Sequence, residues 1–218
     1  MSKVIIFGLE ENSELANFYL EKDSPHDVIA FCVDGQYIQS DNFQGKPVIA
    51  FEEVDQIFPI NVAKFLAPLS PSNMNRDREG VYNRIKAKGY DFISYVSSYA
   101  TVLTDKIGDN CFILEDNTIQ PFVSIGDNVL IWSGNHIGHH SIIHDHVSFT
   151  SHVVLSGRCE VSSYSFLGVN STVRDGVFVA EGTFLAIGSV LTSDTKPWSV
   201  YKSSVAELLK VPSTRVKF

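Results

Sequence analysis

Residues 107–131 read IGDNCF ILEDNT IQPFVS IGDNVL I when the sequence is divided every six residues. The same spacing continues without a break to Leu191, with a large apolar residue at the start of each hexad. These positions are Ile107, Ile113, Ile119, Ile125, Ile131, Ile137, Ile143, Phe149, Leu155, Val161, Leu167, Val173, Val179, Leu185 and Leu191. The residue four places after each of them, from Cys111 to Thr195, is small or medium-sized. A fixed period of this kind indicates a repeat architecture.

Two-residue alternation, which a β-sandwich would show, does not explain a period of six. A triangular solenoid does, because each hexad supplies one short strand and one corner, and three hexads complete a coil. The large residue then fills the interior and the small one fits beside the corner. The sequence therefore predicts a β-helix of about five coils over residues 97–196.

The segments Ile107-Gly-Asp-Asn-Cys-Phe, Ile125-Gly-Asp-Asn-Val-Leu and Phe166-Leu-Gly-Val-Asn-Ser resemble the hexapeptide repeat of the sugar acyltransferases, whose solenoid is a left-handed β-helix. This group includes the sialic-acid O-acetyltransferases and the N-acetyltransferases of nucleotide-linked amino sugars. The resemblance implies transfer of an acetyl group from acetyl-CoA to a hydroxyl or amino group of a sugar. A nucleotide-linked sugar in surface-polysaccharide or glycan biosynthesis is the expected acceptor.

Residues 1–96 show a different pattern, in which apolar strand-like runs alternate with helical ones. Strands are expected at 4–7, 27–33, 47–51, 64–67 and 91–96, and helices at 11–20 and 75–88. This order predicts a small α/β domain, Rossmann-like, with a parallel sheet that serves the acceptor. Residues 197–218, with a short helix at 203–209, are expected to cap the last coil.

The turn after the first expected strand is Gly8-Leu9-Glu10-Glu11-Asn12-Ser13, which lacks a GxGxxG motif. The resemblance implies acceptor binding by Gly8, Glu10, Glu11 and Asn12 in this turn, and by Asp34 after the second strand. Two glutamates are unfavourable beside a phosphate, even at a helix N-terminus. Nucleotide binding by this half and a role limited to packing or to shaping the acceptor pocket therefore both remain open.

Six of the seven histidines lie between His136 and His152. Acetyl transfer needs a base that removes the acceptor's proton, and the pKa of histidine suits that role. The resemblance assigns the base to His139. Relatives often carry an acidic residue next to it, whereas this chain has His140, which is expected to orient His139.

The resemblance also implies a donor site. Acetyl-CoA would lie in a groove between adjacent solenoids of a homotrimer, near Ser148, Gly168, Val169, Ile187 and Gly188. Apart from the resemblance, Gly168 and Gly188 can be explained by turn geometry alone.

Composition excludes several classes of protein. The formal charge of −8 argues against a nucleic-acid surface, which is basic. No apolar run approaches the roughly 18 residues of a membrane span, and the N-terminus lacks a signal-peptide pattern, so a cytoplasmic protein is expected. Three cysteines without CxxC spacing suggest neither a disulfide framework nor a metal site.

Two other classes of function remain open from the residues. His139 and His144 have the spacing of two zinc ligands in the solenoid carbonic anhydrases, although no histidine in an earlier coil supplies a third. The first alternative is therefore a zinc-dependent hydrolyase on the same fold. The second is a non-catalytic solenoid that binds a partner.

Overall fold

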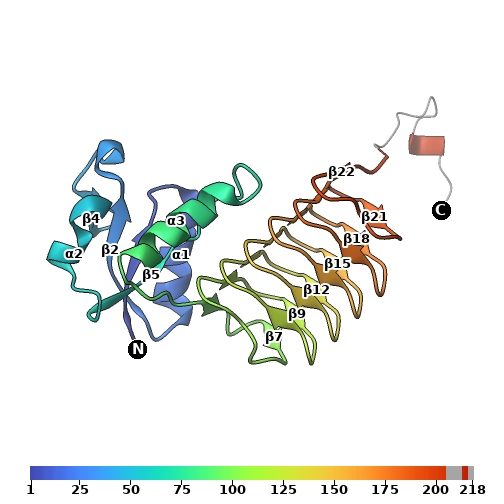
Figure 1. Ribbon diagram of the computed structural model, residues 1–218, viewed down its shortest axis with the longest axis horizontal. Helices are drawn as coiled ribbons and strands as arrows, with labels where there is room; N and C mark the ends of the chain where they lie inside the picture. Colours follow the sequence, from blue (N-terminus) through green and yellow to red (C-terminus); the bar gives the residue numbers. More distant parts are fainter. Residues whose placement is uncertain (205–212, 216–218) are drawn as a thin grey trace.

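The computed structural model describes residues 1–204 and 213–215. An α/β part at the N-terminus lies against a solenoid of stacked coils (Figure 1). In the described residues, no helix has the length and apolar character needed to cross a membrane.

The N-terminal sheet has the strand order β3-β4-β2-β1-β5. Its parallel strands are β1 (Lys3–Phe7), β2 (Asp27–Val33), β4 (Lys46–Ala50) and β5 (Ala63–Leu66), and β3 (Asn42–Phe43) is antiparallel to β4. The helices are α1 (Glu11–Asp23), α2 (Val54–Ile57) and α3 (Arg76–Ala87), with 3₁₀ turns at Gly35–Tyr37 and Phe51–Glu53. The predicted parallel sheet is confirmed, while β3, α2 and the 3₁₀ turns were not predicted.

Period-two alternation along β1 divides the sheet's core between its two faces. Val4 and Ile6 belong to the same buried cluster as Leu20 of α1. Ile5 and Phe7 belong to a second cluster, which also contains α3 residues. Helices therefore cover both faces, and the carboxyl ends of the strands stay open at one edge.

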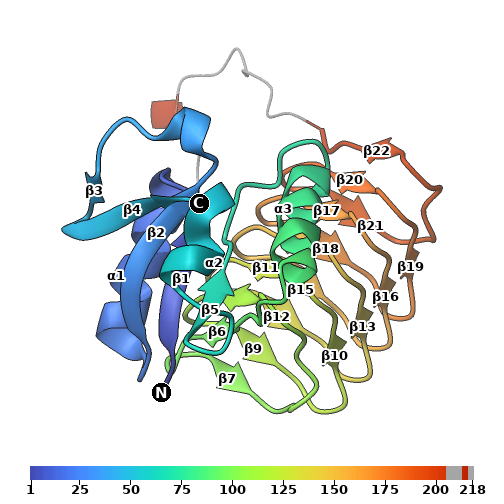
Figure 2. The same cartoon turned by 60° about the vertical axis from the view of Figure 1, so that its left-hand side comes forward.

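The solenoid consists of two-residue strands in three parallel sheets (Figures 1 and 2). The first sheet holds β6 (Tyr95–Val96), β8 (Phe112–Ile113), β11 (Leu130–Ile131), β14 (Ser148–Phe149), β17 (Phe166–Leu167), β20 (Phe184–Leu185) and β22 (Val200–Tyr201). The second holds β7 (Thr101–Val102), β9 (Thr118–Ile119), β12 (His136–Ile137), β15 (Val154–Leu155), β18 (Thr172–Val173) and β21 (Val190–Leu191). The third holds β10 (Ser124–Ile125), β13 (Ile142–Ile143), β16 (Glu160–Val161) and β19 (Phe178–Val179).

The hexad prediction is confirmed residue by residue. From Ile113 to Leu191, every large apolar position is buried in one interior cluster. The small column from Cys111 to Thr195 is buried as well. The pairing of Leu130 with Phe112 and with Ser148 shows that residues one coil apart stack on each other.

The solenoid is longer at both ends than the hexads indicate. Val96 pairs with Ile113 and Tyr201 pairs with Leu185, whereas strict hexads would pair residues 18 apart. These two coils contain fewer than 18 residues, so the six-residue spacing does not continue into them. Most of the helix expected at 203–209 lies outside the described residues.

The prediction of a single strand at 91–96 is wrong. Phe92 makes one isolated bridge with Phe65 of β5, at the edge of the N-terminal sheet. The last two residues of the segment instead form β6 of the solenoid, where Tyr95 pairs with Phe112. This segment therefore passes from one part of the molecule to the other, which a run of apolar residues does not reveal.

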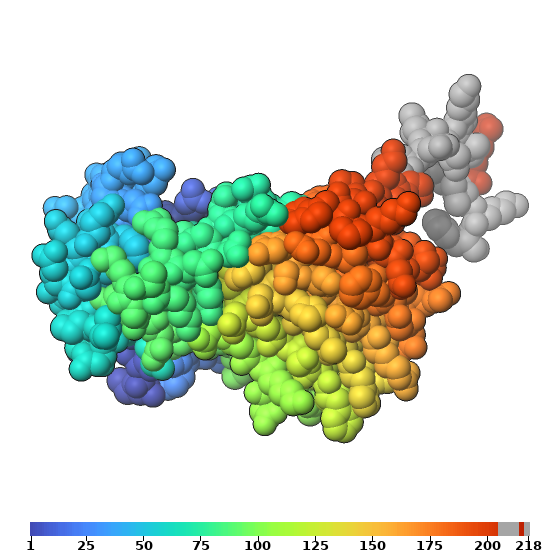
Figure 3. Space-filling view, in the orientation of Figure 1, coloured from blue at the N-terminus to red at the C-terminus, as the bar shows by residue number. Residues whose placement is uncertain are grey.

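Helix α3 lies along one corner of the solenoid, from the first coil to the last (Figure 2). Lys86 at its C-terminal end forms an ion pair with Asp109, 2.5 Å apart. Arg76 at its N-terminal end lies over the ring of Trp198, 4.7 Å from the ring centre. Figure 3 shows the surface of this junction, where the α/β part and the solenoid meet without a gap. Helix α3 therefore connects the α/β part to the solenoid at both ends of the helix.

Gly168→Ala should lower the free energy of unfolding by about 1–3 kcal/mol, because overpacking of a tight site is destabilising. A Cβ at Gly168 would lie 2.7 Å from two backbone atoms, Ile187 N and Leu185 O, which cannot rotate away. Urea unfolding followed by circular dichroism measures the change. Gly80→Ala is the control, since a Cβ at this exposed position in α3 meets nothing within 4 Å and should stabilise the helix. A Gly168→Ala protein as stable as wild type would contradict the steric argument.

Candidate functional site

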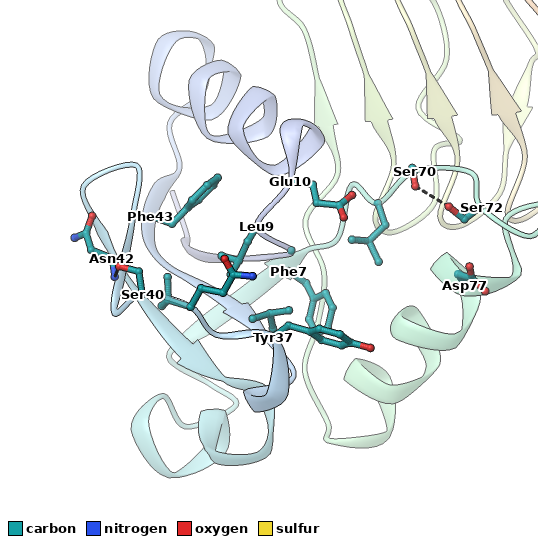
Figure 4. A pocket seen from close by; sticks show the side chains of 15 residues that line it. Phe7, Leu9, Glu10, Tyr37, Ser40, Asn42, Phe43, Ser70, Ser72 and Asp77 are labelled. Atoms are coloured by element: carbon teal, nitrogen blue, oxygen red, sulfur yellow. Dashed lines mark hydrogen bonds between the residues drawn. The ribbon is translucent and has the colours of Figure 1, made fainter.

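A pocket of about 620 Å³ opens where β1, β2 and β5 end (Figure 4). Its walls come from the segments after these strands, from β3 and from the start of α3. The residues labelled in Figure 4 are Phe7, Leu9, Glu10, Tyr37, Ser40, Asn42, Phe43, Ser70, Ser72 and Asp77. Ligands of parallel sheets bind at this edge, outside the carboxyl ends of the strands. The pocket is therefore the candidate acceptor site.

Gly8 shapes the inner end of this pocket. Its φ is 116°, which residues with a side chain rarely adopt, and a Cβ there would lie 2.5 Å from Ser13 Oγ. Gly8 and Glu10, both predicted from the sequence, line the pocket. Glu11 and Asn12 line a more open adjoining hollow together with Glu10.

Asp34 does not line either of these pockets. Its carboxylate forms an ion pair with the guanidinium of Arg84 in α3. The guanidinium also lies over the ring of Phe51, 4.8 Å from its centre. In this structure, Asp34 ties the end of β2 to α3 rather than facing the acceptor pocket.

His139 follows β12 at a corner of the solenoid. Its backbone N–H donates to Gln120 Oε1 at 2.9 Å, and the residue is half-buried. The ring lies over Gly157 of the next coil, where a Cβ would be 2.9 Å from His139 Nε2. Glycine at 157 therefore leaves the room that this imidazole occupies.

His140 is exposed and has a left-handed backbone conformation, with a φ of 59°. Its Nδ1 lies 3.1 Å from Nδ1 of His139, so a hydrogen bond between them requires a proton on one of the two nitrogens. When His139 donates this proton and is neutral, its own Nε2 is the basic nitrogen. On its other side the His140 ring contacts Phe122, with ring centres 4.7 Å apart. The pair thus has the geometry of a base and an orienting neighbour.

Of the remaining clustered histidines, His136 lies in β12, and His144, His146 and His152 lie elsewhere on the prism. His144 Nε2 is 2.8 Å from a carboxylate oxygen of Glu160 on an exposed face. His146 is buried beside α3, and the His152 ring lies over Gly134. In residues 1–204 and 213–215, no three His, Cys, Asp or Glu side chains are placed to hold a metal ion. Nothing in these residues favours the zinc hydrolyase.

Four of the predicted donor residues, Gly168, Val169, Ile187 and Gly188, lie together at one corner. Gly188 N–H donates to Val169 O at 2.8 Å, and 66% of Ile187 is exposed. This corner exposes the apolar side chain of Ile187, while the amide of Gly188 is already hydrogen-bonded within the solenoid. The assignment of these four residues to a donor site remains a prediction.

Ser148, the fifth predicted donor residue, has a different setting. It is buried under α3, with its hydroxyl 2.5 Å from Asn75 Oδ1 and 3.1 Å from Arg78 Nη1. The hydroxyl is already used in the contact between α3 and the solenoid. Ser148 is therefore not part of the candidate donor site.

Arg78 is a central residue of this interface that was not predicted from the sequence. Only 1% of it is exposed, and its guanidinium donates to Asn75 Oδ1, to Ser148 Oγ and to both oxygens of Asn128. Within the described residues, its Nε has no hydrogen-bond partner. Burial lowers the pKa of Arg78. Helical periodicity gave no signal for Arg78, because a charged residue in an amphipathic helix ordinarily lies on its solvent-facing side.

We expect the stability of this interface to depend on pH through His146. Asn128 uses its side-chain oxygen to accept from Arg78 and Asn110, so its Nδ2 donates to His146 Nδ1 at 2.9 Å. Burial lowers the pKa of His146 below its ordinary value of 6.5, and the carboxylate of Glu79, 3.9 Å away, only partly opposes this. As pH falls through about 6.5, the unfolded chain therefore binds a proton before the folded chain does, and stability decreases.

We expect the free energy of unfolding to fall between about pH 7.5 and pH 5.5, and His146→Gln to make this fall smaller. Urea titrations at both pH values measure the two changes. The comparison with the variant separates His146 from the other groups that titrate in this range. Identical changes for wild type and His146→Gln would show that His146 does not cause the dependence.

The acceptor pocket and His139 are separate within one chain. In the described residues, the pocket is lined only by the N-terminal part of the chain, up to Asp77. The corner that α3 covers carries Asp109, Asn128 and Tyr164. His139 lies at another corner, between β12 and β13, so one chain alone does not bring the predicted base to the predicted acceptor residues.

Comparison with known proteins identifies the repeat. Residues 106–138 and 122–157 match the family described as bacterial transferase hexapeptide (six repeats). The chain is 28% identical over 134 residues to an acyl-[acyl-carrier-protein]–UDP-N-acetylglucosamine O-acyltransferase of Campylobacter concisus, covering 52% of this chain and 51% of that protein. It is 26% identical over 121 residues to the enzyme of the same name from Helicobacter pylori, covering 52% and 44%. The chain thus spans about half the length of the curated relatives it matches.

Solved structures match over nearly the whole chain. The acetyltransferase domain of PglB from Neisseria gonorrhoeae has a TM-score of 0.77 at 16% identity, covering 92% of this chain and 96% of that one. A variant of perosamine N-acetyltransferase from Caulobacter crescentus, in complex with CoA and GDP-perosamine, has a TM-score of 0.79 at 17% identity, covering 92% and 93%. WeeI from Acinetobacter baumannii has a TM-score of 0.76 at 14% identity, covering 92% and 96%. The chain therefore carries the hexapeptide repeat of bacterial transferases on a left-handed β-helix, with an α/β sheet in front of it.

Proposed function

We propose that the chain is an acetyl-CoA-dependent acetyltransferase whose acceptor is a hydroxyl or amino group of a sugar. The observation that carries this proposal is the His139–His140 pair, with Nδ1 atoms 3.1 Å apart, at an open corner of the solenoid. A neutral His139 that donates from Nδ1 keeps a lone pair at Nε2, which is what a general base needs. The structures crystallised with CoA or acetyl-CoA on the same fold support the donor.

The reaction follows from these groups. The acceptor's oxygen or nitrogen attacks the carbonyl carbon of the thioester, while His139 Nε2 takes the proton from the attacking atom. The new C–O or C–N bond forms, the C–S bond breaks, and the proton passes to the thiolate of CoA. His140 acts through its contact with His139 Nδ1, which fixes the orientation and the tautomer of the base.

We also propose a homotrimer, in which the site is completed between chains. The support is the separation of the acceptor pocket from His139 within one chain, together with the flat faces that a three-sided prism offers to a neighbour. Gly168, Val169, Ile187 and Gly188 would then wall the acetyl-CoA groove from one side.

Mixed assemblies test the shared site. His139→Asn removes the base, and Tyr37→Ala opens the acceptor pocket without touching the solenoid. If each site takes His139 from one chain and the pocket from another, dissociation, mixing and reassembly of the two impaired variants raises activity above that of either alone. No such gain in assemblies shown by native mass spectrometry to contain both variants would place the whole site in one chain. A protein that sediments as an active monomer would do the same.

Release of free CoA thiol from acetyl-CoA, measured against a panel of sugar acceptors, tests the function itself. Release that depends on the acceptor, with an acetylated product detected by mass spectrometry, is the expected result. A chelator should leave the rate unchanged. An absence of release with every hydroxyl- and amino-bearing sugar would count against the proposal and leave a binding protein as the alternative.

A further inference from the structure

The acceptor pocket is lined by acidic and neutral residues. Among the residues that the structure describes, no lysine or arginine lines it, whereas Glu10 and Asp77 both do. Figure 4 shows these two side chains on the walls nearest α1 and α3. The adjoining hollow adds Glu11 and Glu14. The pocket and its entrance therefore present carboxylates and neutral groups to a ligand.

Cations near the pocket are engaged elsewhere. The ion pairs formed by lysines and arginines of the N-terminal part join Arg84 to Asp34, Lys46 to Glu21, Lys64 to Asp91, Lys86 to Asp109 and Lys88 to Asp55. The guanidinium of Arg78 points into the solenoid interface, and that of Arg76 lies over Trp198. None of these groups lines the pocket.

The N-terminus of α1 does not supply the missing positive charge. A helix N-terminus attracts anions through its free N–H groups and its dipole, which is equivalent to about half an elementary charge. Here Glu10 is the residue before the helix, and Glu11 and Glu14 lie in the first turn. Three acidic residues at this end of the helix oppose the positive end of the dipole, and a diphosphate would add like charge to them.

We propose that this pocket takes a saccharide that is neutral or carries an amino group, and that has no phosphate or diphosphate. This inference rests on the proposed acetyl transfer and narrows its acceptor. Carboxylates accept hydrogen bonds from sugar hydroxyls and bind ammonium groups by charge. The rings of Tyr37 and Phe43 provide apolar surface for the C–H face of a pyranose.

The neutral polar residues of the pocket fit the same ligand. Ser40, Asn42 and Ser70 can donate to and accept from hydroxyl groups, and Ser70 and Ser72 are already linked by a hydrogen bond of 2.9 Å. One carboxylate oxygen of Asp77 accepts a long contact of 3.4 Å from an asparagine in the preceding turn, and the other is left for a further donor. The acceptor inferred here differs from the GDP-linked sugar bound in the Caulobacter crescentus structure.

Matched acceptors test the inference. Methyl glycosides of several aminohexoses are compared with the UDP-linked forms of the same sugars under identical acetyl-CoA concentrations. We expect kcat/KM for the accepted methyl glycoside to exceed that for its UDP-linked form by at least about tenfold. Added salt should narrow this ratio by screening the repulsion. A UDP-linked sugar that is the better acceptor would overturn the inference while leaving acetyl transfer intact.

Variants that each remove one carboxylate test whether Glu10 and Asp77 select the acceptor. Glu10→Gln and Asp77→Asn keep the shapes of the side chains, so each should lower the preference for the methyl glycoside through KM rather than kcat. Glu53→Gln removes an exposed carboxylate that does not line the pocket and should leave the ratio unchanged. A ratio equally insensitive to all three variants would mean that the pocket carboxylates do not select the acceptor.

Binding without turnover keeps this test separate from the test of catalysis. Methyl glycosides of aminohexoses and UDP are each titrated into the full-length protein, with ¹H–¹⁵N spectra as the readout. We expect at least one glycoside to shift the signals of Phe7 and Tyr37, and UDP at millimolar concentration to leave them in place. Shifts produced by UDP but by none of the glycosides would overturn the inference. If glycosides bind and no acceptor is acetylated, the proposed function fails and the ligand class stands.

Discussion

Replacing His139 with asparagine is expected to lower kcat by about 10²- to 10⁴-fold, the usual contribution of a general base. Asparagine keeps polarity and approximate size at this corner, so the fold and the affinity for acetyl-CoA should be retained. It cannot take up the acceptor's proton, so the loss falls on the transition state. Steady-state rates, together with acetyl-CoA binding by calorimetry, separate these two quantities.

Two neighbouring variants serve as controls. His140→Asn should cost less than His139→Asn, because His140 acts by orienting its neighbour through the 3.1 Å contact. Since that role concerns the tautomer of His139, the variant should also shift the pH profile of kcat. His144→Asn, on an exposed face beside Glu160, should be nearly silent. Equal rates for wild type and His139→Asn, on a sugar that wild type acetylates, would refute the catalytic assignment.

Arg78→Ala should lower the free energy of unfolding by about 3 kcal/mol or more. The substitution removes the guanidinium donor of Asn128 O, and a buried polar group left without a partner costs about 1–3 kcal/mol, whereas Asn75 Oδ1 and Ser148 Oγ remain hydrogen-bonded to each other. The space vacated by the long side chain adds a cavity cost. Relief from burying a charge offsets part of this loss. Urea unfolding measures the net change.

Two variants apportion this effect. Arg78→Met fills most of the volume without the hydrogen bonds, so its difference from Arg78→Ala reports the cavity. Arg84→Ala removes a partly exposed arginine of the same helix, whose pair with Asp34 should be worth less than about 1 kcal/mol. Comparable small losses for Arg78→Ala and Arg84→Ala would show that the buried network does not hold α3 on the solenoid.

Much of the fold could be predicted because its rule is local. Each hexad repeats the same choice between interior and surface, so fifteen apolar positions in register specify the stacked coils. The strands β1 and β2 were predictable for a similar reason, as short apolar runs bounded by turns. The six-residue rule failed at Val96 and Tyr201. The coils there are shorter, so a spacing of six no longer identifies the residues that face the interior.

The candidate site was less predictable because it depends on contacts between distant segments. The resemblance assigns Ser148 to the donor site. Its hydroxyl is instead hydrogen-bonded to Asn75, 73 residues earlier in the chain. Asp34 is paired with Arg84, 50 residues away, and does not line the pocket. Neither contact leaves a periodic trace in the sequence. The His139–His140 pair was predictable, since adjacent residues at a corner lie together whatever the rest of the chain does.

The packing of the first coils against the α/β part has a consequence for how the chain folds. Phe112, Leu114 and Leu130 of the early coils belong to the same buried cluster as Val4 and Leu20 of the α/β part. The first strands of the solenoid therefore pack against the α/β part, and every later strand pairs with the strand one coil earlier. Such short sequence separations keep the loop-closure cost of each added coil low. We therefore expect the α/β part to act as a nucleus from which the solenoid grows coil by coil as the ribosome releases the chain.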